Sequence, residues 1–201
     1  MTDGVDPYRL RDRGITDPRV LAAMSAVPRA EFIPPEYQRE ARGDYPLPIG
    51  HGQTISQPFI VAWMSQELAV EPGMRVLEVG TGCGYQTAVL AEIGAEVCSI
   101  EIVSELAACA RDTLTRLRYL DRVHLCLGSG YDGWPEMAPF DRILLTASPP
   151  EIPAALLDQL KDPGRLVGPV GVDWQTLVVV DKRDGEIRRR ESLPVRFVPM
   201  V

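Results

Sequence analysis

Long apolar runs are missing from this 201-residue sequence, which contains no stretch of 18 consecutive apolar residues. A helix that crosses a bilayer needs about 20 such residues, so we expect no membrane-spanning segment and no membrane partner. The first residues, MTDGVDPYRLRDRG, are polar and lack the apolar core of a secretory signal. Together these two features predict a cytoplasmic protein.

Cysteine and histidine are scarce as well, with only Cys83, Cys98, Cys109, Cys126, His51 and His124. No two cysteines form a C-x-x-C pair, and the two histidines lie far apart in the sequence. The spacing therefore predicts neither a metal site nor a disulfide framework. We expect the cysteines to be small buried side chains.

Positive charge is in the minority: 21 lysines and arginines face 28 aspartates and glutamates, which gives a net charge of −7. An acidic chain disfavours nucleic acid as the main partner, since phosphate binding needs basic patches. An anionic protein substrate stays possible, because the charge at a cleft can differ from the total. Hydrophobic residues make up 45% and charged residues 24%, which is typical of an ordinary globular protein, and we expect it to be a monomer.

The first quarter of the chain is irregular. Thr16-Asp17-Pro18 predicts the start of a helix, with a capping side chain before a proline in the first turn, and Leu21, Met24 and Val27 then share one apolar face. Several prolines follow, so residues 28–53 are expected to be mostly turns and extended chain.

From residue 57 onward, predicted helices alternate with short apolar strands. We expect helices at 57–70 (capped by Ser56), 85–93, 104–117 (started by Ser104) and 152–160, and strands at 75–79, 97–100, 123–127, 141–145 and 165–167. This alternation predicts an α/β fold with a doubly wound, mostly parallel sheet. A β-hairpin follows, with strands at 177–180 and 186–192 and a type I′ turn at Asp184-Gly185.

The length favours one domain, residues 1–201, with three parts. Residues 1–56 would form an N-terminal cap and active-site segment. Residues 57–171 would form the α/β core, and residues 172–201 the C-terminal hairpin.

A glycine turn after the strand at 75–79 carries the first chemical signal. Gly80, Gly82 and Gly84 let the backbone turn sharply next to a ligand, and the helix that follows presents free N–H groups. A nicotinamide dinucleotide site is disfavoured, because Tyr85 stands where G-x-G-x-x-G has its third glycine. The turn also lacks the lysine of a nucleotide triphosphate loop, and a tight turn that binds nothing is the plain alternative.

Two further segments favour a nucleoside ligand at this turn. Glu101 ends the next strand, where a carboxylate can accept the ribose hydroxyls of an adenosine. The loop 128–134, GSGYDGW, has glycines that permit backbone contact with a flat base. A solvated carboxylate and a plain surface loop are the alternatives.

The polar segment 51–58, HGQTISQP, is not explained by core packing. Its backbone N–H groups and the hydroxyls of Thr54 and Ser56 could hold a carboxylate. The alternative is a helix cap and its loop.

The sequence resembles the protein-L-isoaspartate O-methyltransferases along nearly its whole length. The glycine turn matches the E-x-G-x-G-x-G motif of class I methyltransferases, and GHGQTISQP is specific to the isoaspartate family. The matching stretches are RGITDPRVLAAMSAVPRAEFIP (13–34), DYPLPIGHGQTISQPFIVAWM (44–64), RVLEVGTGCGYQTAVLA (75–91), APFDRILLTASPPEIPAALLDQL (138–160), GRLVGPVG (164–171) and VRFVPM (195–200).

This resemblance implies a Rossmann-like class I fold that binds S-adenosylmethionine and releases S-adenosylhomocysteine. It implies that Ser56 is the active-site serine. The expected cofactor contacts are Glu78, Gly80, Thr81, Gly82, Gly84, Glu101, Ser129 and Gly130, and the expected substrate contacts are His51, Gln53, Thr54, Ile55, Val195 and Arg196. Phe197 continues the substrate-holding tail.

The sequence departs from the family pattern at two positions. Ser129 stands where the family usually has an aspartate facing the adenine amino group. Loss of the charge predicts cofactor binding that is roughly several-fold to tenfold weaker, which Ser129→Asp should restore. Ile102 replaces a residue that is often basic, which changes the rim of the cofactor pocket.

By the same resemblance, the protein methylates the free carboxylate of L-isoaspartyl residues in damaged proteins and so starts repair through a succinimide. A carboxylate is already ionised near neutral pH, so no general base is required. Ser56 would orient it rather than attack it. The alternatives are a relative that methylates a dedicated aspartate, a cofactor-binding protein without catalysis, and a nicotinamide oxidoreductase.

Overall fold

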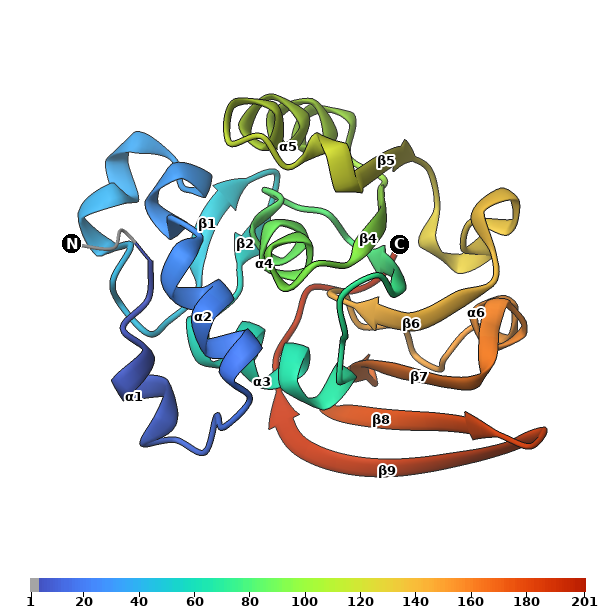
Figure 1. Ribbon diagram of the computed structural model, residues 1–201. Helices are drawn as coiled ribbons and strands as arrows, with labels where there is room; N and C mark the ends of the chain where they lie inside the picture. Colours follow the sequence, from blue (N-terminus) through green and yellow to red (C-terminus); the bar gives the residue numbers. More distant parts are fainter. Residues whose placement is uncertain (1–3) are drawn as a thin grey trace.

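A seven-stranded sheet forms the centre of the computed structural model, which describes residues 4–201 (Figure 1). Five parallel strands are followed by two antiparallel ones, in the spatial order β5-β4-β3-β6-β7-β8-β9. The strands are β3 (Arg75–Val79), β4 (Glu96–Glu101), β5 (Val123–Leu127), β6 (Phe140–Leu145), β7 (Leu160–Val170), β8 (Gln175–Arg183) and β9 (Glu186–Val195). The predicted mostly parallel sheet with its C-terminal hairpin is confirmed.

Helices and short turns surround this sheet. The α-helices are α1 (Pro7–Arg11), α2 (Pro18–Ala26), α3 (Pro58–Leu68), α4 (Tyr85–Ile93), α5 (Ser104–Arg116) and α6 (Ala154–Gln159). Short 3-10 helices lie at Arg29–Phe32, Pro35–Glu40, Leu120–Arg122, Gly130–Asp132 and Pro135–Met137, and β1 (Leu47–Gly50) pairs with β2 (Gln53–Ile55) in a small antiparallel sheet. Within the described chain, no helix is both long and apolar enough to cross a bilayer.

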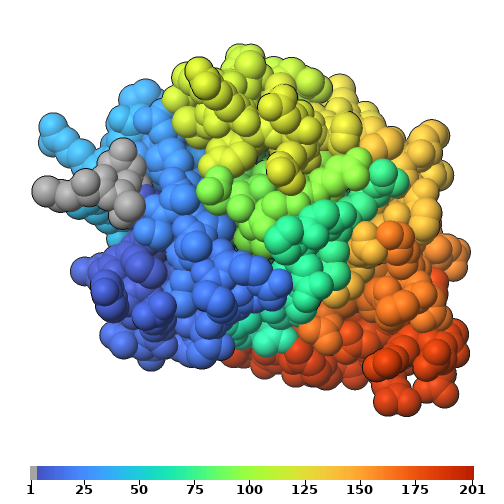
Figure 2. Space-filling view, in the orientation of Figure 1, coloured from blue at the N-terminus to red at the C-terminus, as the bar shows by residue number. Residues whose placement is uncertain are grey.

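The two faces of the sheet have different covers. Val76 of β3 belongs to an apolar cluster that includes residues of α2, α3, α4 and α5, whereas Leu77 and Val79 belong to a second cluster with α6 and the C-terminal Met200. Alternate residues of a strand point to opposite faces, which explains this division. The N-terminal quarter therefore lies against α4 on one face, where Figure 2 shows it as a blue block beside the green core.

The helix starts show one prediction that is confirmed and one that is wrong. Asp17 caps α2, because its Oδ1 accepts a hydrogen bond from the Arg19 N–H at 2.8 Å. Ser56 does not cap α3: the helix starts later, at Pro58, and Gln57 at the cap makes no side-chain hydrogen bond there. Asp44 takes that role from a distance, since its Oδ1 accepts from the Phe59 N–H at 2.9 Å.

Other differences concern lengths and exposure. Helix α6 and strand β7 differ from the expected 152–160 and 165–167, and the pairing of β1 with β2 was not predicted. The hairpin turn has positive φ at Asp184 (53°) and Gly185 (77°), as a type I′ turn requires. Cys98 is buried as expected, but Cys109 is exposed on α5, so the expectation of burial is wrong there.

Candidate functional site

A pocket opens where strands β3, β4 and β6 end, the edge of a parallel sheet at which ligands bind. Loops and chain segments from four parts of the molecule form its walls. They include residues 53–56, 79–83, 100–102 and 197–201, together with Gly128, Gly130, Thr146 and Ala147. The structure thus brings the predicted serine segment, the glycine turn and Glu101 into one pocket, which we call the cofactor pocket.

The glycine turn at the floor of this pocket depends on missing side chains. Gly80 has φ +101°, and a Cβ there would lie 2.3 Å from Thr146 Oγ1. Thr146 Oγ1 in turn lies within hydrogen-bond distance of the carbonyl oxygens of Val79, at 2.9 Å, and Gly80, so its single hydroxyl proton is shared between them. Gly130 is equally confined, because its Cβ would meet Val79. Only glycine fits at these two positions, and the backbone is open to a ligand.

Glu101 is held rigidly at the rim of the cofactor pocket and is only 7% exposed. Its Oε1 accepts from the backbone N–H groups of Ile102 and Val103, both at 2.9 Å, and its Oε2 accepts from Gly82 N–H at 2.7 Å. A carboxylate has about four acceptor positions, so one on Oε2 is left after these three bonds. That free position can accept a hydrogen bond from a hydroxyl group of a ligand.

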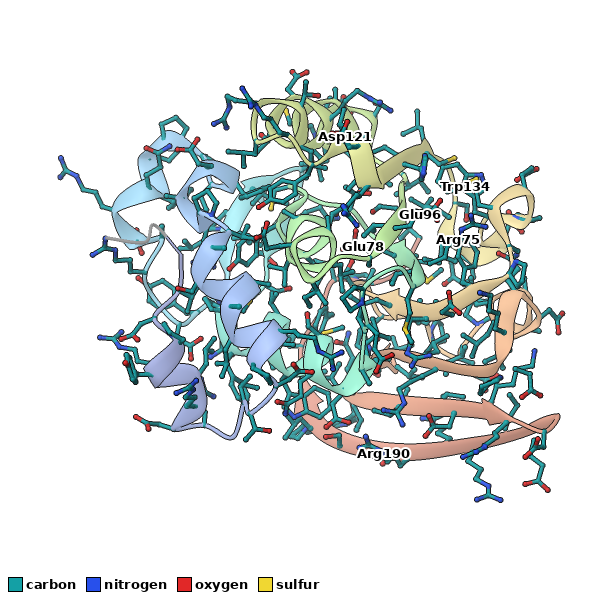
Figure 3. All side chains as sticks on the ribbon, in the orientation of Figure 1. Arg75, Glu78, Glu96, Asp121, Trp134 and Arg190 are labelled. Carbon is teal, nitrogen blue, oxygen red and sulfur yellow. The ribbon has the colours of Figure 1, made fainter. Side chains whose placement is uncertain are left out.

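Glu78 is not part of the pocket wall and lies in the interior beside α4 (Figure 3). Its Oε2 accepts from the hydroxyls of Thr87 and Ser99, and Ser99 Oγ lies 2.6 Å from Thr81 Oγ1. Ser99 gives its proton to Glu78, so Thr81 must donate to Ser99. Burial raises the pKa of the Glu78 carboxyl to about 7, although the two hydroxyl hydrogen bonds oppose the shift.

A second pocket adjoins the first, and we call it the acceptor pocket. The two share Thr54, Ser56, Thr146, Phe197 and Val198 in their walls. Arg196 is the charged residue among those that line the acceptor pocket, whereas Glu101 is the charged residue of the cofactor pocket. Two adjoining pockets of opposite charge therefore meet at Ser56.

A buried arginine, which the sequence did not single out, holds the Ser56 segment in place. Arg29 is 1% exposed, and its guanidinium donates to the carbonyl oxygens of Ala41 (2.9 Å), Gly43 (3.5 Å), Tyr45 (3.0 Å) and Ser56 (3.2 Å). Burial lowers the pKa of Arg29. Because Ser56 is anchored through its carbonyl oxygen, its hydroxyl takes no part in this anchorage.

Some predicted contacts lie outside the walls of both pockets. His51 is exposed in the turn between β1 and β2, and Ser129 Oγ accepts from the Tyr131 N–H at 3.3 Å. Gly84 is the cap residue before α4, and a Cβ there would lie 3.2 Å from Leu114 Cδ1 of α5, so glycine at this position allows the two helices to pack closely. With Glu78, these are the predicted residues that do not line either pocket.

The sequence also missed several wall residues. Thr146 and Ala147 follow β6, and residues 198–201 return across the sheet to close the cofactor pocket. Ser148 fixes the segment 198–201 in place, because its N–H donates to Val198 O at 2.8 Å and its carbonyl oxygen accepts from Met200 N–H at 2.9 Å. The position of Thr146, directly after a predicted parallel strand, was a usable signal.

Comparisons with known proteins agree with this arrangement. The family model described as protein-L-isoaspartate(D-aspartate) O-methyltransferase (PCMT) matches residues 8–201. A protein-L-isoaspartate O-methyltransferase of Gloeobacter violaceus is 54% identical over 194 residues, which are 96% of this chain and 94% of that protein.

Solved structures lead to the same family. A protein-L-isoaspartate O-methyltransferase superposes with a TM-score of 0.87 and 29% identity, over 96% of this chain and 64% of that longer one. A Plasmodium falciparum structure is described as a protein-L-isoaspartate O-methyltransferase in complex with S-adenosyl-L-homocysteine. It superposes with a TM-score of 0.86 and 29% identity, over 97% of this chain and 96% of that chain. This chain belongs to the protein-L-isoaspartate(D-aspartate) O-methyltransferase family.

Proposed function

We propose that this protein transfers a methyl group from S-adenosylmethionine to the free carboxylate of L-isoaspartyl residues in proteins and peptides. The observation that carries this function is the pair of pockets of opposite charge that meet at Ser56. A methyltransferase needs the methyl donor and its acceptor side by side, and the shared wall of the two pockets supplies that arrangement.

The residues of the cofactor pocket fit S-adenosylmethionine. The free acceptor position of Glu101 Oε2 suits a ribose hydroxyl, and the backbone of Gly80, Gly82 and Gly130 permits close contact. Gly128 faces open space, which leaves room for a flat base. When bound, S-adenosylmethionine supplies an activated methyl group, which passes to a carboxylate oxygen and leaves a methyl ester and S-adenosylhomocysteine.

The acceptor pocket suits an anionic side chain. Arg196 attracts a carboxylate, which is already ionised near neutral pH and needs no base to activate it. The hydroxyls of Thr54 and Ser56 can donate hydrogen bonds that fix its direction. We propose that Ser56 orients the acceptor oxygen and that the rigid walls exclude water. The ester product closes to a succinimide without further help, and hydrolysis returns part of it to normal aspartate.

A methyl-transfer assay with paired peptides tests this function. We expect transfer to an isoaspartyl peptide and none to its aspartyl twin. Ser56→Ala should lower kcat on the isoaspartyl peptide by about ten- to a hundredfold, because a poorly oriented acceptor reacts slowly. Cofactor affinity, measured by calorimetry with S-adenosylhomocysteine, should change little.

Other outcomes would select the alternatives. Methylation of the aspartyl twin alone would indicate a dedicated aspartate substrate, and cofactor binding without any turnover would indicate a binding protein. An acyl-serine species trapped on Ser56 would contradict the orienting role. Action as a cytoplasmic monomer without a nucleic-acid partner stays a prediction.

A further inference from the structure

An exposed tryptophan lines a groove beside the acceptor pocket. Trp174 is 91% exposed, and Val172 in the same β7–β8 connection is 68% exposed. Tryptophan is usually buried, and an exposed one next to a groove is typical of a binding contact. Both residues lie within the described part of the chain, and the functions proposed above leave them unused.

The connection that carries Trp174 is held at both ends. Gly171 N–H donates to Pro149 O at 3.0 Å, and Ser148 Oγ donates to Gly171 O at 2.8 Å. On the other side, the Gln175 amide binds both the N–H and the carbonyl of Phe197. The groove therefore has a largely fixed wall, which reduces the entropy lost when a ligand binds.

This groove is continuous with the acceptor pocket. Pro194, Val195, Arg196 and Phe197 line both of them, and the groove continues from these residues to Trp174 and to Tyr131. A peptide whose isoaspartyl carboxylate sits beside Ser56 must leave the acceptor pocket, and these shared residues mark a path for it.

We infer that this groove binds the residues on one side of the isoaspartyl residue in the substrate peptide, and that Trp174 contacts an apolar or aromatic side chain there. The inference rests on the proposed function and adds a substrate preference to it. The apolar surface of Trp174, Val172 and Phe197 fits such a side chain.

A scan of flanking residues tests the groove. The parent is a short isoaspartyl peptide with alanine at every other position, and each variant carries a single phenylalanine at one of those positions. For the wild-type enzyme, we expect phenylalanine at one or two positions on one side to lower KM by about tenfold, with kcat unchanged.

Trp174→Ala should remove this preference, so that the phenylalanine variants and the parent peptide have equal KM values, while the affinity for S-adenosylhomocysteine, whose pocket does not include Trp174, stays the same. Tyr8→Ala is the matched control, because Tyr8 is an aromatic residue that is 72% exposed on α1 and lies outside both proposed pockets. It should keep the preference for phenylalanine.

Different outcomes contradict this inference and the proposed function, so the experiment distinguishes the two. Methylation of all peptides with equal KM, or a preference that survives Trp174→Ala, would overturn the groove but leave the methyltransferase function intact. If no peptide is methylated, the proposed function is wrong. Fluorescence anisotropy with S-adenosylhomocysteine present then measures the Kd of the labelled peptides, and a phenylalanine peptide that does not bind about tenfold more tightly than the parent would overturn the groove as well. Self-association lost in Trp174→Ala would assign the patch to a second copy and overturn the inference.

Discussion

At the scale of single residues, the two carboxylates near the cofactor pocket differ in their surroundings. Glu101 accepts three backbone N–H groups at the rim, whereas Glu78 is fully buried and its Oε1 has no hydrogen-bond partner among residues 4–201. Burial without full hydrogen bonding disfavours the charged form, which explains why the pKa of Glu78 is raised to about 7. Glu78 therefore changes its charge near neutral pH.

We predict that Glu78 makes the protein less stable as the pH rises. The pKa of about 7 in the folded protein lies above the ordinary value of 4.5, so the folded state retains a proton that the unfolded chain releases. This stabilisation is fully present below about pH 4.5 and is lost as the pH rises through about 7. Glutamine stays neutral at every pH. The free energy of unfolding of Glu78→Gln should therefore rise relative to that of the wild type by about 2–3 kcal/mol between pH 5 and pH 8.

Urea unfolding of both proteins at the two pH values measures this difference. Comparing the variant with the wild type cancels the titration of all other groups. A difference in the free energy of unfolding that is the same at both pH values would show that Glu78 is ionised throughout.

The sequence could identify some site residues and not others, for physical reasons. Gly80, Gly82, Glu101 and Ser56 line the pockets, and their residue types together with their positions at the end of a strand or before a helix made them visible in the sequence, although their roles in binding stay predictions. Arg29 could not be found, since its partners are carbonyl oxygens whose positions depend on the folded path of residues 41–56.

At the scale of elements, the strand–turn–helix unit from β3 to α4 was predicted correctly because its signals are local. Strand β3 and helix α4 coincide with the expected 75–79 and 85–93. The start of α3 was predicted incorrectly, because its cap comes from Asp44, whose side chain reaches across the loop to the Phe59 N–H. Strand β7 is longer than expected, since pairing with both β6 and β8 supports residues with little strand preference of their own.

The glycine turn itself gives a prediction at this scale. Gly80→Ala should destabilise the protein by more than Gly73→Ala and weaken binding of S-adenosylhomocysteine by at least about tenfold. Both glycines have positive φ, which costs an alanine about 1–2 kcal/mol. Only at Gly80 does the added Cβ also meet Thr146 Oγ1, which its hydrogen bonds hold in place.

Gly73→Ala is the matched control, because its Cβ meets nothing within 4 Å and Gly73 lies outside the pocket walls. Urea unfolding and calorimetric titration compare the two variants. Equal losses of stability, or unchanged cofactor affinity in Gly80→Ala, would show that Thr146 moves aside and that the turn is not confined.

At the scale of the whole molecule, the N-terminal cap and the α/β core share one hydrophobic cluster. Leu10, Ile15 and Met24 of the cap belong to the same cluster as Val76 and Leu90 of the core. Phe32 also packs edge-to-face on Tyr85 of α4, with ring centroids 5.6 Å apart. Leu177 and Val179 of the C-terminal hairpin belong to this cluster as well, so the three parts expected from the sequence are packed together, although their existence as one domain stays a prediction.

We predict that the protein unfolds in a single cooperative step, because separating the cap from the core would expose apolar residues of their shared cluster to water. Far-ultraviolet circular dichroism and tryptophan fluorescence should give the same midpoint in urea. Saturating S-adenosylhomocysteine should raise both midpoints equally, as expected for a ligand that binds only the folded state. An early transition seen by one probe alone would indicate a cap that melts separately.

The anchorage of the serine segment by Arg29 bears on how freely this part of the protein can vary. Arg29 binds main-chain oxygens, which every amino acid possesses. The side chain of Tyr45, which is 45% exposed, can therefore be exchanged without releasing the anchor. Substitutions that accumulate at such a position during evolution leave Ser56 in place. Protein engineers can likewise change the side chains on this surface with little risk to turnover.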